Sequence, residues 1–314
     1  MISLLLALAQ PAIAGSSPWT LPRGHHNVFL GGELGGYGKI PNAQGDPVAL
    51  STRVGAAKVF GTYGIGLANG FDVELLLPFE RAWVANEDGG FCSGGARPDD
   101  WCQATAGLGD VALTARIRLL DEASYRPFTV TARVVARSGQ AYASSRHRLT
   151  SLGDGTNDVG AGLSVGRTGA SKGGAWYRLS LASDFWYRFA VGQVDGNKVP
   201  ANEVSANIDA IGSPVFWLGL GASAAGFHRL GGAPLSSPAT PIGHPLTWVG
   251  LRASQVRVGP TVALYSLDGW TLFTNASFTA WSKSAPTDIT SFTLGVGRYI
   301  GGKDESSPVP RGPR

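Results

Sequence analysis

The sequence predicts an all-β protein, an antiparallel up-and-down transmembrane β-barrel of about 12 strands. Three observations predict it: apolar and polar residues alternate along most of the chain, short and long connections alternate, and no stretch of about 18 apolar residues could form a membrane-spanning helix. The composition agrees. A chain with 45 Gly and only 15% charged residues suits many strands and tight turns better than helices.

The alternation is clearest in three segments. Between Phe71 and Phe79 every odd position is apolar, and acidic residues lie on the even positions. The segments Val111 to Leu119 and Phe128 to Ala136 repeat the pattern, with arginines and threonines between the apolar residues. Because successive side chains of a strand point to opposite faces, each segment predicts one apolar face and one polar face.

Further strands are predicted at lower contrast, and they bring the total to about twelve, an even number. A long segment changes phase near Ser254 and contains Pro260, which predicts one strand with a β-bulge. The complete set is Asn27 to Gly36, Ala49 to Gly61, Asn157 to Arg167, Trp176 to Phe189, Asn202 to Ile211, Val215 to Phe227, Leu246 to Leu267, Trp270 to Trp281 and Ser291 to Ile300.

The predicted connections are alternately short and long. Short ones follow Gly61, Leu120, Arg167, Ile211 and Leu267, and they include Gly212-Ser213-Pro214 and the hairpin signature Asp268-Gly269. The long ones are Pro41 to Val48, Ala85 to Leu108, Gly139 to Thr156, Gly192 to Ala201 and His228 to Pro245. Since outer-membrane barrels have short periplasmic turns and long outer loops, we expect the first strand to begin on the periplasmic side.

Aromatic residues gather at both ends of the predicted strands. Rings prefer the headgroup level of a bilayer, so this pattern predicts two aromatic girdles, although strand ends of soluble β-proteins also carry aromatic residues. The periplasmic set is Trp176, Trp217, Tyr265, Trp270 and Tyr299, and the outer set is Trp83, Tyr187, Trp248 and Trp281.

The structural rival is a soluble β-sandwich or lipocalin-like barrel, in which the apolar face points inward. Two arguments oppose it. A soluble barrel of this many strands would have a wide lumen to fill with bulky side chains, and its outer face would need more charges than this chain provides. We therefore expect the apolar face to contact lipid.

The two ends of the chain differ from the middle. Residues 1–14 form a short apolar run that ends in Ala12-Ile13-Ala14, which predicts a signal peptide and export. The barrel is expected to span residues 15–300, followed by a polar C-terminal tail at 301–314. In an exported protein the nearby Cys92 and Cys102 predict a disulfide bond that closes a small loop.

Three segments resemble the outer-membrane proteins of the MetA-pathway-of-phenol-degradation family. They are NGFDVELLLPF at Asn69 to Phe79, GLGDVALTARIRLL at Gly107 to Leu120, and TLGVGRYI at Thr293 to Ile300. The resemblance implies a transporter of the bacterial outer membrane, encoded near genes of aromatic degradation. Unlike such barrels, which usually end on an aromatic residue, this chain continues past Tyr299 into the polar tail.

The candidate functional residues are the charged and polar side chains on the predicted inner face. They could form a network of ion pairs that stiffens the wall, or a polar constriction that selects solutes. These candidates for lining a pore are Asp72, Glu74, Glu80, Asp110, Arg116, Arg118, Arg133, Arg137, Arg178, Asp184, Arg188, Glu203, Asn207 and Asp209. No cofactor or metal site is predicted. The modest net charge of +4 and the dispersed arginines disfavour a nucleic-acid partner.

The leading functional hypothesis is a passive channel for small hydrophobic or aromatic compounds, with outer-membrane lipid and a small solute as partners and no enzymatic activity. One alternative is a barrel enzyme acting on lipid or peptide, in which His147, His228 and His244 would meet Asp154 or Ser144. Another is a closed structural or adhesive barrel. The sequence leaves open the solute, the direction of flux, the oligomeric state and the presence of a plug.

Overall fold

The computed structural model describes residues 17–41, 46–84, 104–122, 126–138, 156–170, 175–190, 202–231 and 252–301. In these ranges the chain forms one 13-stranded antiparallel sheet. Its strands are β1 (His26–Pro41), β2 (Pro47–Ala68), β3 (Phe71–Val84), β4 (Ala104–Leu108), β5 (Val111–Leu120), β6 (Thr129–Ser138), β7 (Thr156–Ala170), β8 (Trp176–Ala190), β9 (Glu203–Val215), β10 (Leu218–Arg229), β11 (Ser254–Tyr265), β12 (Trp270–Lys283) and β13 (Thr290–Ile300).

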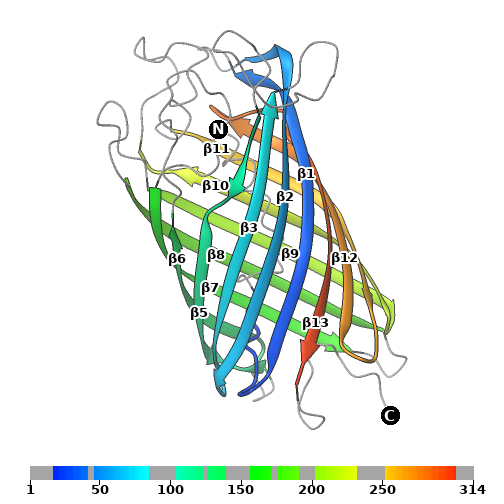
Figure 1. Cartoon of the computed structure of the whole chain (residues 1–314). Coiled ribbons are helices and arrows are strands. Elements are labelled where there is room, and N and C mark those ends of the chain that lie inside the picture. Colours follow the sequence, from blue (N-terminus) through cyan, green and yellow to red (C-terminus); the bar gives the residue numbers. More distant parts are fainter. Residues whose placement is uncertain are drawn as a thin grey trace.

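The sheet closes into a barrel with tilted strands (Figure 1). One wall position is shared by two strands, since β4 pairs with β3 at Phe79 to Trp83 and β5 pairs with β3 at Phe71 to Leu76. Between them the wall continues through Gly109, whose N–H donates to the Pro78 carbonyl at 2.9 Å. The predicted 12-strand up-and-down barrel is therefore confirmed, with one of its strand positions divided between β4 and β5.

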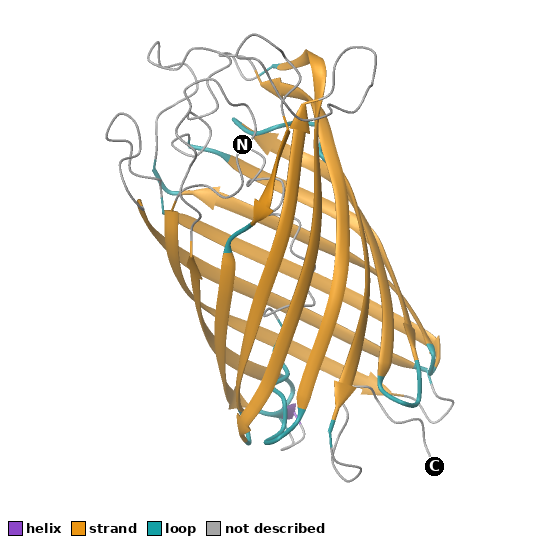
Figure 2. Cartoon of the chain, in the orientation of Figure 1, coloured by secondary structure: helices purple, strands orange, loops and turns teal. Residues whose placement is uncertain are grey.

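Closure joins the first strand to the last. β1 and β13 pair without a register shift from His26↔Ile300 to Gly36↔Thr290. The start of β1 and the end of β13 consequently lie at the same end of the barrel, which we call the turn end because the tight turns lie there (Figure 2). The opposite edge, the loop end, carries connections that fall largely outside the described residues.

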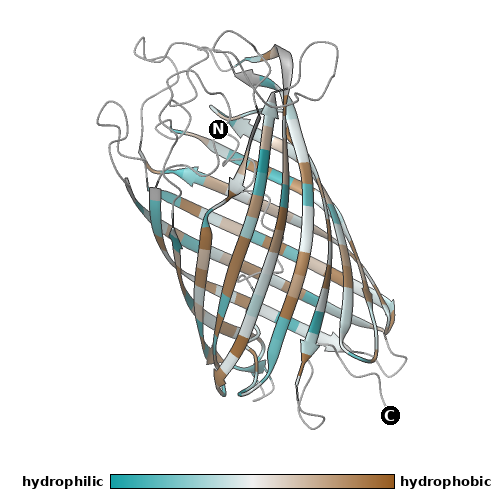
Figure 3. Ribbon diagram, viewed as in Figure 1, coloured by the Kyte–Doolittle hydropathy of each residue, from teal (hydrophilic) through white to brown (hydrophobic). Residues whose placement is uncertain are grey.

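Side-chain exposure separates the two faces of the sheet as the alternation predicts. On β5 the side chains of Leu113 and Ile117 are 52% and 53% exposed, whereas Thr114 and Arg116 between them are buried. Figure 3 shows the same alternation of apolar and polar residues along the strands. A closed barrel that exposes its apolar side chains and buries its charges is stable in lipid and not in water, which excludes the soluble rival.

One predicted turn is wrong. Gly212, Ser213 and Pro214 continue β9, and the turn lies at Phe216 and Trp217. The pairing of β9 with β10 shifts between Leu218 and Leu220, and Pro214 falls in this irregular stretch. A proline is tolerated there because no regular ladder bond needs its missing N–H.

The other irregularities agree better with the prediction. The Asp268-Gly269 hairpin is present, with Gly269 at φ 81°, a conformation that favours glycine. The predicted bulge near Ser254 is found as a shift between Val256 and Arg257, which face Trp281 and Thr279 of β12. The extra residue therefore lies on β12 and not on β11. Within the described part of the chain, no helix is long and apolar enough to span a bilayer.

The connection between β12 and β13 folds back onto the barrel. Ala285 and Ile289 are fully buried, and Ala285 clusters with Phe227 and Ala253 of the inner face. The carboxylate of Asp288 accepts hydrogen bonds from the backbone N–H groups of residues 38 and 39. This connection therefore narrows the barrel at the loop end.

The lipid-facing assignment makes a quantitative prediction. Leu163→Arg, on the exposed face of β7, should lower the free energy of unfolding in vesicles by about 2–4 kcal/mol if the site is near the bilayer midplane. Asn207→Arg, on the inner face of β9, is the matched control and should cost less. Denaturant titration followed by tryptophan fluorescence measures both values. Equal costs would contradict the assignment of the faces.

Several predictions lie outside the described residues. They concern the signal peptide at 1–14, the polar tail at 301–314, the Cys92–Cys102 disulfide and most of the long loops.

Candidate functional site

The structure places the sequence-predicted site residues on the inner face of the barrel, where most of the charged ones form ion pairs along the wall. The buried members are Asp72, Glu74, Glu80, Arg116, Arg133, Arg137, Asp184, Arg188 and Glu203, and the half-buried ones are Asp110, Arg118, Arg178, Asn207 and Asp209. Of the two arrangements considered for them, the network of ion pairs is present, and it joins strands that are neighbours or next neighbours. Their role in lining a pore remains a prediction.

The first cluster is built on β3 and β5. The register sets Asp72 opposite Arg116, and the guanidinium donates to both carboxylate oxygens of Asp72 at 2.8 Å. Glu74 lies 3.8 Å from the same guanidinium. A two-point contact of this kind is charge-assisted and fixes the orientation of both groups. Burial makes it expensive to break, because either partner alone would be an uncompensated charge.

A second ion pair spans three strands. Arg133 on β6 binds Asp184 on β8, and Gly162 on β7 lies between them in the same row. A Cβ at Gly162 would overlap Asp184, so only glycine leaves room for the two side chains to meet above β7. Gly162 of β7 thus makes room for an ion pair between the two strands that flank β7.

A row of alternating charges follows at the loop ends of five consecutive strands. Arg137, Asp158, Arg188, Glu203 and Arg229 are buried on β6 to β10, and each N···O separation between neighbours is 3.3 to 3.9 Å. Two arginines at the ends of the row lie over aromatic rings, Arg137 at 4.5 Å from the centroid of the Trp186 ring and Arg229 at 5.4 Å from that of Phe227. Such contacts stabilise a desolvated guanidinium.

Sequence reasoning missed several inner-face charges. Lys58 on β2 pairs with Glu80 at 3.7 Å, and Glu33 on β1 and Arg257 on β11 are both buried. Asp158 and Arg229 were missed as well. A parity signal exists in each strand, but β1 and β2 are rich in glycine, which carries no side chain to mark either face.

The segment 17–25 before β1 lies inside the barrel at the turn end. The Leu21 N–H donates to Asp72 at 2.7 Å, and Arg116 donates to the Ser17 carbonyl at 3.4 Å. The Trp19 indole donates to Glu122 at 3.1 Å. Next to the wall, Gly24 N–H donates to the Gly66 carbonyl at 2.8 Å. We call residues 17–25 the inner segment, and it narrows the barrel from the turn end.

Glycines of the wall make room for the inner segment. A Cβ at Gly66 would overlap the Pro22 carbonyl, and a Cβ at Gly166 would overlap the ring of Pro18. The Thr131 hydroxyl donates to the Pro18 carbonyl, so wall and segment are matched on both sides. The inner segment is therefore held in a defined position by the wall.

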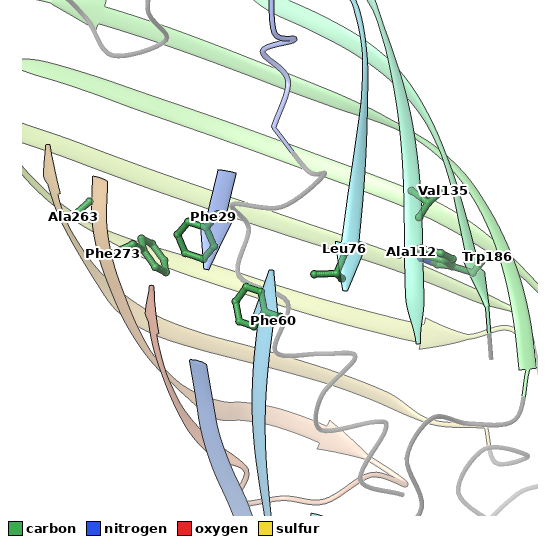
Figure 4. Close-up of a cluster of buried hydrophobic side chains, with 8 residues drawn as sticks. All are labelled: Phe29, Phe60, Leu76, Ala112, Val135, Trp186, Ala263 and Phe273. Atoms are coloured by element: carbon green, nitrogen blue, oxygen red, sulfur yellow. The ribbon is translucent and has the colours of Figure 1, made fainter. Parts of the chain in front are cut away.

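An apolar belt interrupts the charged inner face. Its residues come from eight strands and point into the barrel (Figure 4). They are Phe29, Phe60, Leu76, Ala112, Val135, Trp186, Ala263 and Phe273, all buried. The Phe29 and Phe60 rings stack at 5.9 Å. A Cβ at Gly295 would overlap Phe29, so this ring lies flat along the wall.

The aromatic girdle prediction is partly wrong. Trp217, Trp270, Tyr187 and Trp281 are exposed on the outside as expected. Trp176 is buried on the inner face and meets Tyr265 edge to face at 5.3 Å, and Tyr299 contacts His25 of the inner segment. The reason is parity, because Trp176 has the same phase as Arg178 and Asp184. Trp83 is half-buried, and Trp248 lies outside the described residues.

The loop histidines cannot be assembled into a site from the described residues. His228, predicted to lie in a loop, is the penultimate residue of β10, and its imidazole contacts the Ser254 hydroxyl at 2.7 Å. His147, His244, Asp154 and Ser144 lie outside the described ranges.

Comparison with solved structures identifies the architecture. An outer membrane channel from Pseudomonas putida F1 superposes with a TM-score of 0.69 at 14% identity, over 93% of this chain and 100% of that one. The NanC porin gives a TM-score of 0.47 at 10% identity, over 87% and 98% of the two chains. No protein-family model and no curated protein matches the sequence. The chain is a barrel of the outer-membrane type.

The charged and aromatic side chains described above converge on the inner face of the barrel. Here that face presents paired charges, one apolar belt, and two narrowings, the inner segment and the connection between β12 and β13. The candidate functional site is therefore this lined interior as a whole.

Proposed function

We propose that this chain is a passive channel of the bacterial outer membrane for small hydrophobic or aromatic compounds. The observation that carries the proposal is the apolar belt, because bulky aromatic side chains point into the barrel on a face that otherwise carries charges. A structural barrel has no need of aromatic rings on a polar inner face, whereas a passing ring gains from contact with them.

Two further points support this function. The resemblance of three segments to transporters encoded near aromatic-degradation genes implies the same class of solute. The overall fold, shared with an outer membrane channel, is the one in which passive transport through a lined barrel occurs.

Reconstitution tests the proposal. Planar bilayers containing the folded protein should show single-channel conductance. Liposomes containing it should admit phenyl glucoside, a neutral probe that does not cross the bilayer unaided. Its rate of entry, relative to that of the smaller methyl glucoside, should exceed the rate that the difference in size predicts. A folded barrel with neither conductance nor flux would overturn the proposal.

The belt itself can be tested with a matched pair of variants. Phe29→Ala with Phe60→Ala removes the stacked pair, which at about 0.5–1.5 kcal/mol should lower the flux of phenyl glucoside about two- to tenfold. Phe278→Ala removes an exposed phenylalanine of the outer face and should leave the flux unchanged. Equal effects of the two variants would contradict a role of the belt.

A further inference from the structure

The inner wall formed by β1, β11, β12 and β13 holds buried polar atoms without a hydrogen-bond partner. On Arg257, 3% exposed, the Nε and Nη1 groups lack acceptors, while Nη2 donates to the hydroxyls of Ser277 and Ser291. On the acceptor side, Glu33 Oε2 and Gln255 Oε1 lack donors. Unpartnered buried groups are costly, so a bound molecule that supplies the missing acceptors and donors would be favoured at this wall.

The charges around these atoms balance. Glu33 interacts with both Arg257 and Lys58, and Lys58 pairs in turn with Glu80 at 3.7 Å. Two cations and two anions leave the patch neutral. A solute with one net charge would upset this balance, whereas a neutral solute that bears both a cation and an anion preserves it and can satisfy both kinds of open group.

An aromatic surface lies one step along the same wall. Phe60 is opposite Gly31, two residues from Glu33 on β1, which is about 6.7 Å along a strand. An aromatic amino acid whose head group lies at Glu33 can therefore reach this surface with its ring. A Cβ at Gly31 would overlap both Phe60 and Phe29, so the two rings lie over the backbone of Gly31.

We propose that this wall binds zwitterionic solutes with an aromatic side chain, that is, aromatic α-amino acids. The carboxylate takes the open donors of Arg257, the ammonium takes the open oxygen of Glu33, and the ring lies against Phe60 and Phe29. The proposal rests on the proposed channel function and names a solute class for it.

Single-channel recording with L-phenylalanine as the probe tests this assignment. L-phenylalanine should interrupt the ionic current at lower concentration than 3-phenylpropionate, which lacks the ammonium, or phenethylamine, which lacks the carboxylate. Arg257→Gln and Glu33→Gln should each weaken the interruption by about tenfold or more, as expected for the loss of a charge-assisted hydrogen bond. Arg81→Gln changes an exposed arginine on the outer face of β3 and should leave the interruption unchanged.

The outcomes separate the two proposals. Normal conductance with no preference for L-phenylalanine over the two analogues would overturn the amino-acid site and leave the channel intact. Absence of conductance would overturn the channel. Should Arg257→Gln fail to fold, as judged by circular dichroism, Arg257→Lys keeps the charge but loses the Nε and Nη1 donors. A wild-type response in that folded variant would equally refute the site.

Discussion

Replacing Asp72 by alanine is expected to release the inner segment and to increase the single-channel conductance. Asp72 is fully buried and holds two partners at once, the Arg116 guanidinium at 2.8 Å and the Leu21 N–H at 2.7 Å. Its loss leaves Arg116 paired with Glu74, whose carboxylate lies 3.8 Å from the guanidinium. Breaking a buried pair by removing one partner costs about 3–5 kcal/mol, so a lower free energy of unfolding should accompany the change.

Glu74→Ala is the matched control for Asp72→Ala. It removes a carboxylate from the same strand and the same arginine but leaves the bond to Leu21 in place. We expect it to lower stability less and to leave the conductance near the wild-type value. If both folded variants conduct equally, Asp72 does not anchor the inner segment.

The second large effect is expected at the ion pair that passes over β7. Asp184→Ala leaves the buried Arg133 guanidinium without its carboxylate partner and should lower the free energy of unfolding by about 3–5 kcal/mol. Denaturant titration in vesicles measures the loss.

A double variant shows whether the pair itself is responsible. Arg133→Met with Asp184→Leu replaces both charges by apolar groups and should recover most of the stability, because no unpaired charge remains. A cycle of the two single variants and the double one gives the coupling energy. Simple additivity of the two single effects would show that Arg133 and Asp184 act independently.

The fold was predictable because each strand must sort its side chains between lipid and the interior. In β3, β5 and β6 the alternation is uninterrupted, and the structure confirms both the strands and their order. The prediction failed where side chains carry no such information. Gly212 and Pro214 usually mark a turn, and only the irregular pairing of β9 with β10 shows that they do not.

The site was predictable in part for the same reason. Parity alone identified Asp72, Arg116, Arg133 and Asp184 as inner-face residues, but it could not assign their partners. The contact between Arg133 and Asp184 depends on Gly162, a residue with no side chain to signal it.

Two features of the interior could not be derived from periodicity at all. The inner segment precedes the first strand, and its bonds to Asp72 and Glu122 join residues far apart in the sequence. The apolar belt consists of single residues such as Phe29 and Phe273, each on a different strand, which meet only when the sheet has closed.

The joining of β1 to β13 has a consequence for how the protein assembles. His25 and Tyr299, in contact in the finished molecule, are 274 residues apart, so this junction closes the longest loop of the chain and carries the largest entropic cost. We therefore expect it to form last. Until it does, the edges of β1 and β13 are unpaired, and the inner segment can enter the barrel through the gap between these two strands. After closure, the inner segment could enter the interior only through an open end of the barrel.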